Sequence, residues 1–291
     1  MPKQDLTADL HIHSTASDGE WPPEQVVDCA ADAGLSAVAL TDHDTVAGLT
    51  RAVARGLERR VAVFSGCELT AYEGQIELHI LALFVDVGPE SPFAALLEKL
   101  QEARRARARQ SVARLCAAGI AIEDSDVLRA AGEASSIGRP HLAAALVKRG
   151  HAPSLQAAQT RFLREGRPGY VPKMRLTPDA VIAAVHASGG LTILAHPGST
   201  PHDELIAPLF QRGLDGIEAS SPAHSDVNHR FYAGLARRYE KLISGGSDFH
   251  GPALKPGVVI GAGGVDRQTL ARLRREAEKR QAALATPLSQ R

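Results

Sequence analysis

The chain has 291 residues, of which 44% are hydrophobic, and its 33 Lys and Arg residues balance its 33 Asp and Glu residues. This length suits one barrel-sized domain or a domain with an insertion, and the apolar fraction predicts a sizeable core. A net charge of zero excludes a chain-wide attraction to nucleic acid or to a membrane surface, so any basic surface must be local.

The beginning of the chain alternates predicted strands with predicted helices. Residues 6–13 form a strand in which His11 and His13 share one face, because side chains in a strand repeat every two residues. A helix follows over residues 22–35, where a proline pair suits the first turn. The next elements are a strand at 36–44, a helix at 45–60 and strands at 60–69 and 75–85. This β-α-β rhythm predicts a mainly parallel sheet.

The pattern changes between residues 91 and 166, where only helices are predicted. Each ends at a glycine, as helices often do, and they span residues 92–119, 125–132, 139–150 and 154–166. We therefore expect a helical insertion over residues 91–166 that covers the substrate. The main domain would then comprise residues 1–90 and 167–291.

The alternation of strands and helices resumes after the predicted insertion. Helices are expected at 177–190, 225–240 and 266–285, strands at 191–196 and 241–250, and a short edge strand at 257–261. About seven parallel strands result. The predicted fold is an α/β, distorted (β/α)₇ TIM-like barrel, with its site at the carboxyl ends of the strands.

Side chains that bind metals recur at the ends of the predicted strands. One histidine on an apolar strand is ordinarily a core residue, but recurrence at corresponding strand ends indicates a pocket built by many strands. Imidazoles and carboxylates without thiolates suit Mn²⁺, Zn²⁺ or Fe²⁺ better than Mg²⁺ or Ca²⁺. The nine candidate ligands are His11, His13, Asp18, His43, Glu68, His79, His196, Asp248 and His250.

The segments that carry these ligands resemble the successive motifs of the PHP superfamily, named for polymerase and histidinol phosphatase. They read DLHIHSTASDG, ALTDHDT, GCELT, ELHILAL, ILAHP and GSDFH, in family order. The resemblance covers both ends of the chain and omits only the helical insertion. That insertion, with SSIGRPHLA and YVPK beside it, is similar to that of bacterial nucleoside 3′,5′-bisphosphate phosphatases, some of which are also 5′→3′ exoribonucleases.

The resemblance implies three divalent ions, with Mn²⁺ expected and Zn²⁺ or Fe²⁺ as alternatives. It places His11, His13, Glu68 and Asp248 around the first ion, Glu68, His79 and His196 around the second, and Asp18, His43 and His250 around the third. The cluster would neutralise an anionic phosphate ester. The attacking hydroxide would be held at metals bound by His11, His13, Glu68, His79, His196 and Asp248.

Four further residues are candidate substrate contacts. An arginine fork can hold phosphate through two hydrogen bonds, while lysine acts as a point charge. The candidates are Arg139, Lys173, His224 and Ser135. Each has an ordinary alternative: the first three would be surface residues, and the serine would cap the next helix.

Two other groups of charged residues have competing interpretations. Asp42 and Asp44 flank His43, and either orient it or hydrogen-bond the turn. An arginine run without interleaved aromatic residues favours a solvated helix face over an oligonucleotide-binding face. The run consists of Arg104, Arg105, Arg107 and Arg109.

The resemblance implies a phosphohydrolase that removes the 3′-phosphate of nucleoside 3′,5′-bisphosphates, with 5′→3′ exoribonuclease activity on short RNA as a companion. Histidinol phosphate phosphatase and a noncatalytic PHP metal-binding module are the alternatives. We expect a cytoplasmic protein with a nucleotide substrate, no membrane association and no obligate protein partner. No apolar stretch approaches the ~20 residues of a membrane span. Cys29, Cys67 and Cys116 are odd in number and lack Cys-x-x-Cys spacing, which indicates a reducing cytoplasm. A buried thiol is expected for Cys67, because thiols are commonly buried.

Overall fold

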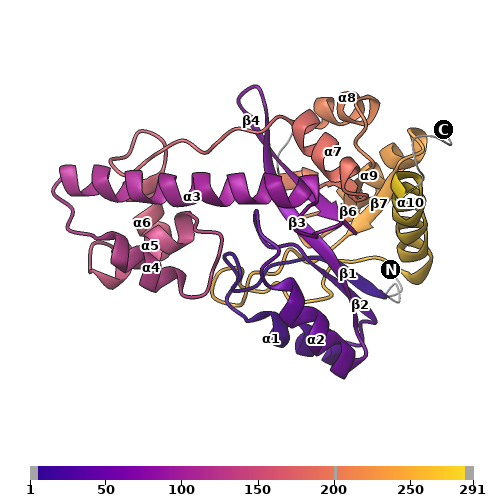
Figure 1. The fold of residues 1–291 in the computed structure, drawn as a ribbon, viewed down its shortest axis with the longest axis horizontal. Helices are drawn as coiled ribbons and strands as arrows, with labels where there is room; N and C mark the ends of the chain where they lie inside the picture. Colours follow the sequence, from indigo (N-terminus) through magenta and orange to yellow (C-terminus); the bar gives the residue numbers. More distant parts are fainter. Residues whose placement is uncertain (1–5, 200–201, 286–291) are drawn as a thin grey trace.

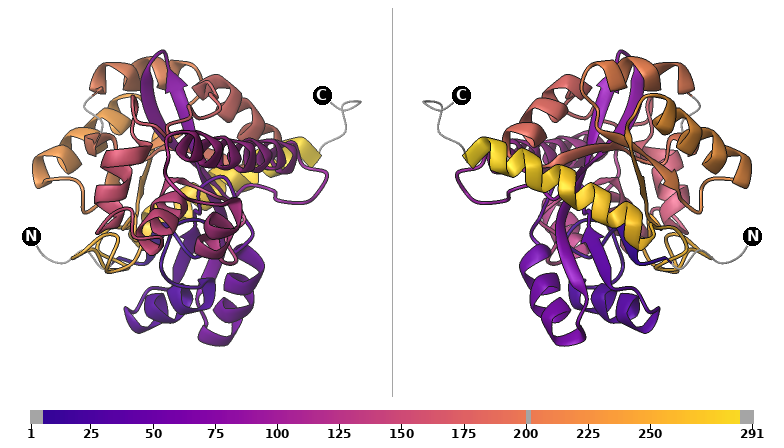
Figure 2. Two further views of the ribbon diagram at one scale, coloured as in Figure 1. Left: turned by 90° about the vertical axis from the view of Figure 1, so that its left-hand side faces the viewer. Right: turned by 90° about the vertical axis from the view of Figure 1, so that its right-hand side faces the viewer.

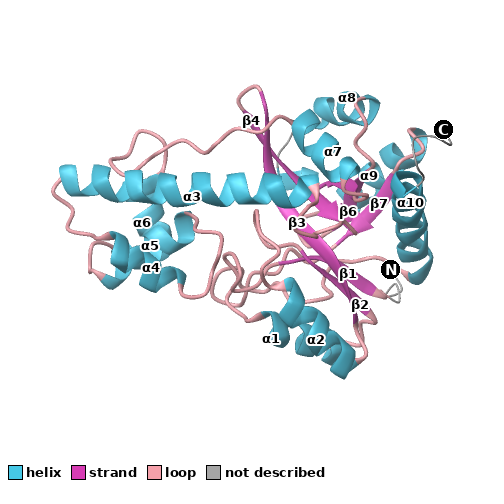
Figure 3. Cartoon of the chain, in the orientation of Figure 1, coloured by secondary structure: helices cyan, strands magenta, loops and turns pink. Residues whose placement is uncertain are grey.

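The computed structural model describes residues 6–199 and 202–285. Its centre is a seven-stranded sheet in the order β1-β2-β3-β4-β5-β6-β7, with helices around it (Figures 1 and 3). The strands are β1 Ala8–Ile12, β2 Ala37–Leu40, β3 Ala62–Glu73, β4 Ile76–Leu83, β5 Leu191–Leu194, β6 Gly216–Ser220 and β7 Leu242–Gly245. The predicted α/β class is confirmed.

The helices fall into two groups along the chain. Around the sheet are α1 Pro23–Asp32, α2 Leu49–Arg59, α7 Pro178–Ala187, α8 Ile206–Gln211, α9 Asp226–Arg238 and α10 Arg267–Ala285. Between β4 and α7 are α3 Pro92–Ala117, α4 Asp124–Ala131, α5 Arg139–Lys148, α6 Leu155–Ala158 and the π-helical turn η1 Gln159–Leu163. Two 3₁₀ turns, η2 Pro197–Ser199 and η3 Asp203–Leu205, follow β5.

Strand β4 runs antiparallel to both of its neighbours, β3 and β5. The expectation of seven parallel strands is therefore wrong at this position. Only Gly74 and Gln75 lie between β3 and β4, and two residues can close a hairpin but cannot make a parallel crossover. The hairpin register pairs Thr70 with His79, which brings the middle of β4 beside Glu68 on β3.

The two ends of the sheet approach each other through the segment that follows β7. Asp248 N–H donates to His11 O at 2.8 Å, and His13 N–H donates to Phe249 O at 2.9 Å. Complete closure into a barrel stays a prediction. The predicted edge strand at 257–261 is wrong, because this segment forms turns in which Gly257 and Gly261 have φ of 83° and 81°.

Helix α3 belongs to two hydrophobic cores. Near its start, Phe93 and Leu97 pack with residues of the sheet, whereas Val112 and Leu115 near its end pack with α4, α5 and α6. In Figure 1, α3 extends from the sheet toward these three short helices. All elements between residues 91 and 166 are helical, as predicted; the division into two domains stays a prediction.

Helix α10 covers the amino ends of the parallel strands (Figure 2). Arg280 Nη2 lies 2.7 Å from Asp215 Oδ1, just before β6, and Arg280 Nη1 donates to Gly190 O at 2.6 Å, just before β5. The carboxyl ends of these strands lie at the opposite edge of the sheet, where the chain continues into loops. Across residues 6–199 and 202–285, no helix is long and apolar enough to cross a membrane.

Candidate metal centre

The nine predicted ligands come together where the loops leave the carboxyl ends of the parallel strands. Their ligand atoms form three sets, and within each set all atoms lie within 4.8 Å of one another. The sets are His11, His13, Glu68 and Asp248; Glu68, His79 and His196; and His13, Asp18, His43 and His250. The groups implied by the resemblance recur, with His13 added to the last.

The strands explain this convergence. His11 lies in β1, and His43, His196 and Asp248 lie in the segments that directly follow β2, β5 and β7. Because the carboxyl ends of parallel strands meet at one edge of a sheet, ligands far apart in sequence become neighbours. Glu68 reaches the same place from the middle of the longer strand β3.

Glu68 is the hub of the cluster and is 1% exposed. Its Oε1 lies 2.7 Å from His79 Nδ1 and 3.0 Å from His196 Nε2. Its Oε2 lies 3.3 Å from His11 Nε2 and 3.1 Å from His13 Nε2. One carboxylate thus has one oxygen in each of two sets, which is the arrangement of a bridging ligand.

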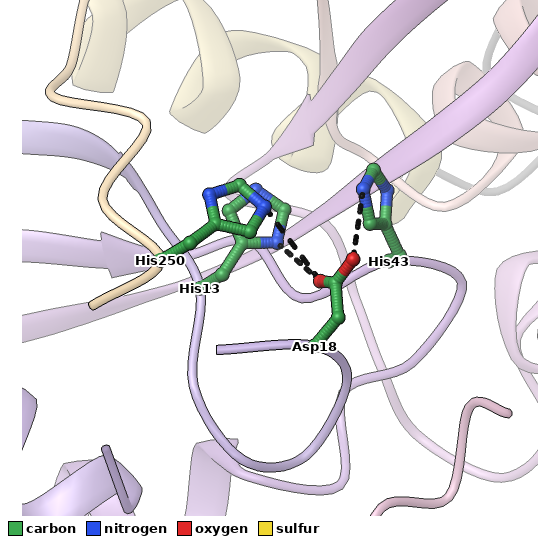
Figure 4. Close-up of side chains that lie close together, drawn as sticks. All are labelled: His13, Asp18, His43 and His250. Carbon is green, nitrogen blue, oxygen red and sulfur yellow. Dashed lines mark ion pairs between the residues drawn. The ribbon is translucent and has the colours of Figure 1, made fainter. Parts of the chain in front are cut away.

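Asp18 faces three imidazoles (Figure 4). Asp18 Oδ1 lies 3.6 Å from His13 Nδ1 and 3.7 Å from His250 Nε2, and Asp18 Oδ2 lies 3.9 Å from His43 Nε2. These separations are too long for hydrogen bonds. Two ligand atoms that each lie about 2.1 Å from one ion are themselves roughly 3–3.5 Å apart. Small inward shifts of the Asp18 oxygens and the imidazole nitrogens would therefore allow them to share one ion.

The buried nitrogens of the cluster fit a bound cation. His11 Nε2 and His13 Nε2 face each other at 3.2 Å. Within the described chain, the buried Nδ1 atoms of His13 and His43 have no hydrogen-bond partner, and such an orphan costs about 1–3 kcal/mol. An ion that accepts these lone pairs would remove that cost. The donors are imidazoles and carboxylates, and Cys67 is a buried thiol, as predicted, which contacts Asp42 O at 3.3 Å.

Three of the six non-glycine residues with positive φ in the described part of the chain lie at this centre. Asp44, His196 and Asp248 have φ of 53°, 26° and 52°, a region that residues with a Cβ atom adopt at a cost of about 1–3 kcal/mol each. Gly246 allows a close approach, because a Cβ atom there would lie 2.3 Å from the Cβ of His11. The fold thus holds the ligand loops in conformations that the isolated segments would avoid.

Glu218, on β6, contacts two of the predicted ligands and is absent from the sequence-based candidates. It is fully buried, its Oε1 lies 3.2 Å from His11 Nδ1, and its Oε2 accepts a hydrogen bond from His196 N–H at 2.7 Å. The carboxylate therefore holds the proton of His11 on Nδ1 and leaves Nε2 free to face the cluster. The only signal in the sequence was an acid within an apolar strand.

We expect Glu218→Gln to weaken metal binding by about 10–100-fold, because outer partners of ligating histidines contribute on that scale. The measurement is titration of metal-free protein with Mn²⁺. Glu204→Gln is the control, since Glu204 is exposed and pairs with His202, which belongs to none of the three ligand sets. Equal affinities for Glu218→Gln and wild type would show that the Glu218 contact does not support the ligand.

The two acids that flank His43 have different roles. Asp42 accepts hydrogen bonds from Ser14 N–H at 2.8 Å and Ser17 Oγ–H at 2.6 Å, so it orders the loop that carries Asp18. Burial raises the pKa of Asp42 to about 6. Asp42 thus hydrogen-bonds the loop after β1 and not its own turn. Asp44 instead contacts helix α3.

The arginine run on α3 has two faces, and the interpretation as one solvated face is only half right. Arg105 and Arg109 are exposed. Arg104 and Arg107 are partly buried, and Arg104 Nε donates to Asp44 Oδ2 at 2.5 Å. The helical repeat of 3.6 residues separates the two pairs, so α3 presents two cations to the centre.

Two of the candidate substrate contacts lie beside this face of α3. Lys173 Nζ lies 2.5 Å from Glu77 Oε1, and Glu77 is in turn 3.3 Å from His79 Nε2. Arg139 begins α5, and no carboxylate pairs with it among the residues that the structure describes. It lies close enough to Lys173 to lower the pKa of that amine, although burial lowers it more.

The other two candidates have partners within the protein. Ser135 Oγ lies 2.6 Å from Thr45 Oγ1, which joins the insertion to the loop after β2. His224 Nδ1–H donates to Ala219 O at 2.9 Å, while its Nε2 accepts from Gly198 N–H at 3.0 Å. To contact a phosphate, His224 would have to exchange one of these bonds. A further cation, Lys255, was missed and contacts the carboxylate of Asp248.

Comparison with known proteins adds independent evidence. A family model described as "PHP domain" matches residues 9–128. The chain is 36% identical to a 3′,5′-nucleoside bisphosphate phosphatase of Chromobacterium violaceum, over 84% of this chain and 87% of that protein. It is 37% identical to a phosphoribosyl 1,2-cyclic phosphate 1,2-diphosphodiesterase of Eggerthella lenta, over 84% of this chain and 95% of that protein.

An RNA-processing enzyme and a solved structure are also similar. The 5′-3′ exoribonuclease Rnm of Escherichia coli is 33% identical over 84% of this chain and 85% of its own. A crystal structure from Bifidobacterium adolescentis, described as a metal-dependent phosphoesterase, superposes with a TM-score of 0.83 at 30% identity. That superposition covers 99% of both chains.

Proposed function

The chain belongs to the PHP family of metal-dependent phosphoesterases, and we propose that it removes the 3′-phosphate of nucleoside 3′,5′-bisphosphates to give a 5′-nucleotide and phosphate. The observation that carries this proposal is the convergence of nine imidazoles and carboxylates in three sets beside a cationic face of α3. The C. violaceum relative of that name supports the choice of substrate.

We assign three divalent ions, Mn²⁺ first among them, to the three sets of ligands. Such ions supply Lewis acidity toward phosphoryl oxygens and ionise water near neutral pH. The protein's part is to hold its ligands in the right protonation state. Glu68 spans two sets, Glu218 keeps His11 Nε2 free, and Asp42 positions the loop of Asp18.

The substrate would be oriented by cations that surround the centre. Arg139 offers a guanidinium fork, and Lys173 a single charge that must be shared with Glu77. Ser135 and His224 would contribute hydrogen bonds in place of their present partners. Each of these groups positions phosphate oxygens and lowers the cost of bringing an anion to the reacting atoms.

A substrate panel with Mn²⁺ present tests the proposal. We expect the highest kcat/KM for a nucleoside 3′,5′-bisphosphate, by about tenfold or more over histidinol phosphate and phosphoribosyl 1,2-cyclic phosphate. One tenfold step needs only about 1.4 kcal/mol of differential transition-state binding. If histidinol phosphate or phosphoribosyl 1,2-cyclic phosphate had a higher kcat/KM than the bisphosphate, the proposed substrate would be wrong and that compound would take its place.

Exoribonuclease action on short 5′-phosphorylated RNA is a second candidate, favoured by the similarity to the E. coli Rnm enzyme. It predicts mononucleotide products released from the 5′ end. A noncatalytic module is opposed by the presence of all nine ligands in the three sets. A cytoplasmic location stays a prediction.

A further inference from the structure

Helix α9 carries a line of side chains that faces away from the sheet. Its inner side is buried through Tyr232, Ala233 and Ala236. On its outer side, Val227 and Phe231 are 65% and 47% exposed. With 3.6 residues per turn, residues spaced by four, three and four positions fall on one narrow line, which is the spacing of a seam between two packed helices. This outer stripe of α9 consists of Val227, Phe231, Gly234 and Arg238.

The glycine within the outer stripe has no explanation inside the chain. Glycine in the interior of a helix lowers its stability relative to alanine. In α2, Gly56 has a packing reason, because a Cβ atom there would lie 2.5 Å from Val61 O. A Cβ atom at Gly234 would meet nothing within 4 Å. A close approach to Gly234 by a group from another molecule would account for the glycine.

The outer stripe is complementary to a second copy of itself. When two α9 helices run antiparallel about a twofold axis midway between Phe231 and Gly234, the ring of Phe231 in each copy lies opposite Gly234 of the other. Val227 then lies level with Arg238. A large side chain thus faces a missing one at both central positions, which is the interdigitation that helix packing requires. A twofold interface needs one surface that supplies both halves, and this stripe does so.

The two ends of α9 carry opposite charges. Asp226 begins the helix, whereas Arg237 and Arg238 end it. All three are exposed, and none has an ion-pair partner among the residues that the structure describes. Antiparallel pairing brings the acidic end of each helix to the basic end of the other. Asp226 also lines a hollow of about 1010 Å³ whose described lining contains no lysine or arginine, so the partner's arginines have room beside the carboxylate.

We propose that the chain forms a twofold dimer through the outer stripe of α9. Exposed apolar side chains, an unexplained glycine and unpaired charges of opposite sign all lie on one helix, in an order that matches its own reverse. A second copy of the chain is therefore the partner that this face fits. One helix pair with its flanking hollows is a small interface, so the dimer should dissociate in the micromolar range.

Sedimentation velocity of the full, metal-loaded chain between about 1 and 100 μM tests the dimer. Phe231→Glu should weaken dimerisation by at least about 100-fold, because each substitution acts twice in a twofold interface. Leu57→Glu is the matched control, since Leu57 is an exposed apolar residue on α2. Gly234→Ala should weaken the dimer about tenfold. In the Phe231→Glu background it should instead raise the unfolding temperature, because alanine favours a helix.

A charge exchange tests the antiparallel pairing itself. Asp226→Lys and the double variant Arg237→Glu, Arg238→Glu should each self-associate at least about tenfold more weakly than wild type. An equimolar mixture of the two variants should recover dimers, because opposite charges then meet at both ends of the helix pair. A wild-type chain that stays monomeric would assign this face to some other partner and overturn the proposal. So would a dimer that Phe231→Glu leaves unchanged, or a mixture that does not recover.

Discussion

Glu68→Gln should reduce phosphate release by at least about 10³-fold, because it disables two of the three ligand sets at once. Each Glu68 oxygen faces a different set, and a neutral amide offers one oxygen and one nitrogen donor in their place. The NH₂ group would point its hydrogens at an ion or at an imidazole lone pair. Loss of transition-state stabilisation by metal ions amounts to several kcal/mol, which corresponds to this factor.

The measurement for Glu68→Gln is phosphate release together with elemental analysis of metal-loaded protein. Only the set of His13, Asp18, His43 and His250 lacks Glu68, so about one ion per chain should remain. Glu73→Gln is the control, since Glu73 lies on the same strand but pairs with Arg212. Wild-type metal content in Glu68→Gln would refute its bridging role.

His13→Ala should be equally inactive but should retain a different ion. His13 belongs to the set that contains Asp248 and to the set that contains Asp18. It is not part of the set of Glu68, His79 and His196. The remaining ion therefore lacks its neighbours, and the phosphoryl charge would be only partly neutralised. A loss of about 10³-fold or more in kcat is expected.

The two variants together distinguish three sets from one loose cluster. Each should keep about one ion, in complementary places, and adding Glu68→Gln to His13→Ala should remove all three. His151→Ala is the control, because His151 belongs to none of the three sets and contacts Ala121 O between α3 and α4. If His13→Ala kept three ions or turned over substrate at the wild-type rate, the ligand assignment would be wrong.

The ligands could be predicted from sequence because their positions obey two local rules. The two-residue repeat of a strand puts His11 and His13 on one face, and parallel strands bring their carboxyl ends together. These rules account for His11, His13, His196 and Asp248, whereas Glu68 and His79 lie within the β3–β4 hairpin and are placed by the resemblance. The two rules do not identify Glu218, which contacts His11 across 207 positions of sequence and looks locally like any strand residue.

The roles of the arginines on α3 show a different limit. The helical repeat already separates Arg104 and Arg107 from Arg105 and Arg109. Which pair faces the protein depends on where the loop that contains Asp44 lies, and that is a tertiary property. The absence of interleaved aromatic residues argues against a base-stacking surface, but it carries no information about which arginines face the protein.

The orientation of β4 could have been predicted. The sequence predicts that the strand ends at residue 69, whereas β3 continues to Glu73. Even the predicted connection, residues 70–74, is too short for a parallel crossover. The two residues between β3 and β4, Gly74 and Gln75, are a hairpin signal. The alternating rhythm of the surrounding elements outweighed that signal.

Ligands drawn from the first and last strands also determine when this site can exist. A polypeptide is made from its amino terminus, and its early segments emerge first. The set of Glu68, His79 and His196 can assemble once β5 has emerged, but the other two require Asp248 and His250 beyond β7. Two of the three sets can therefore bind an ion only after the first strand and the segment after the last strand have come together, and ions bound there would stabilise that contact.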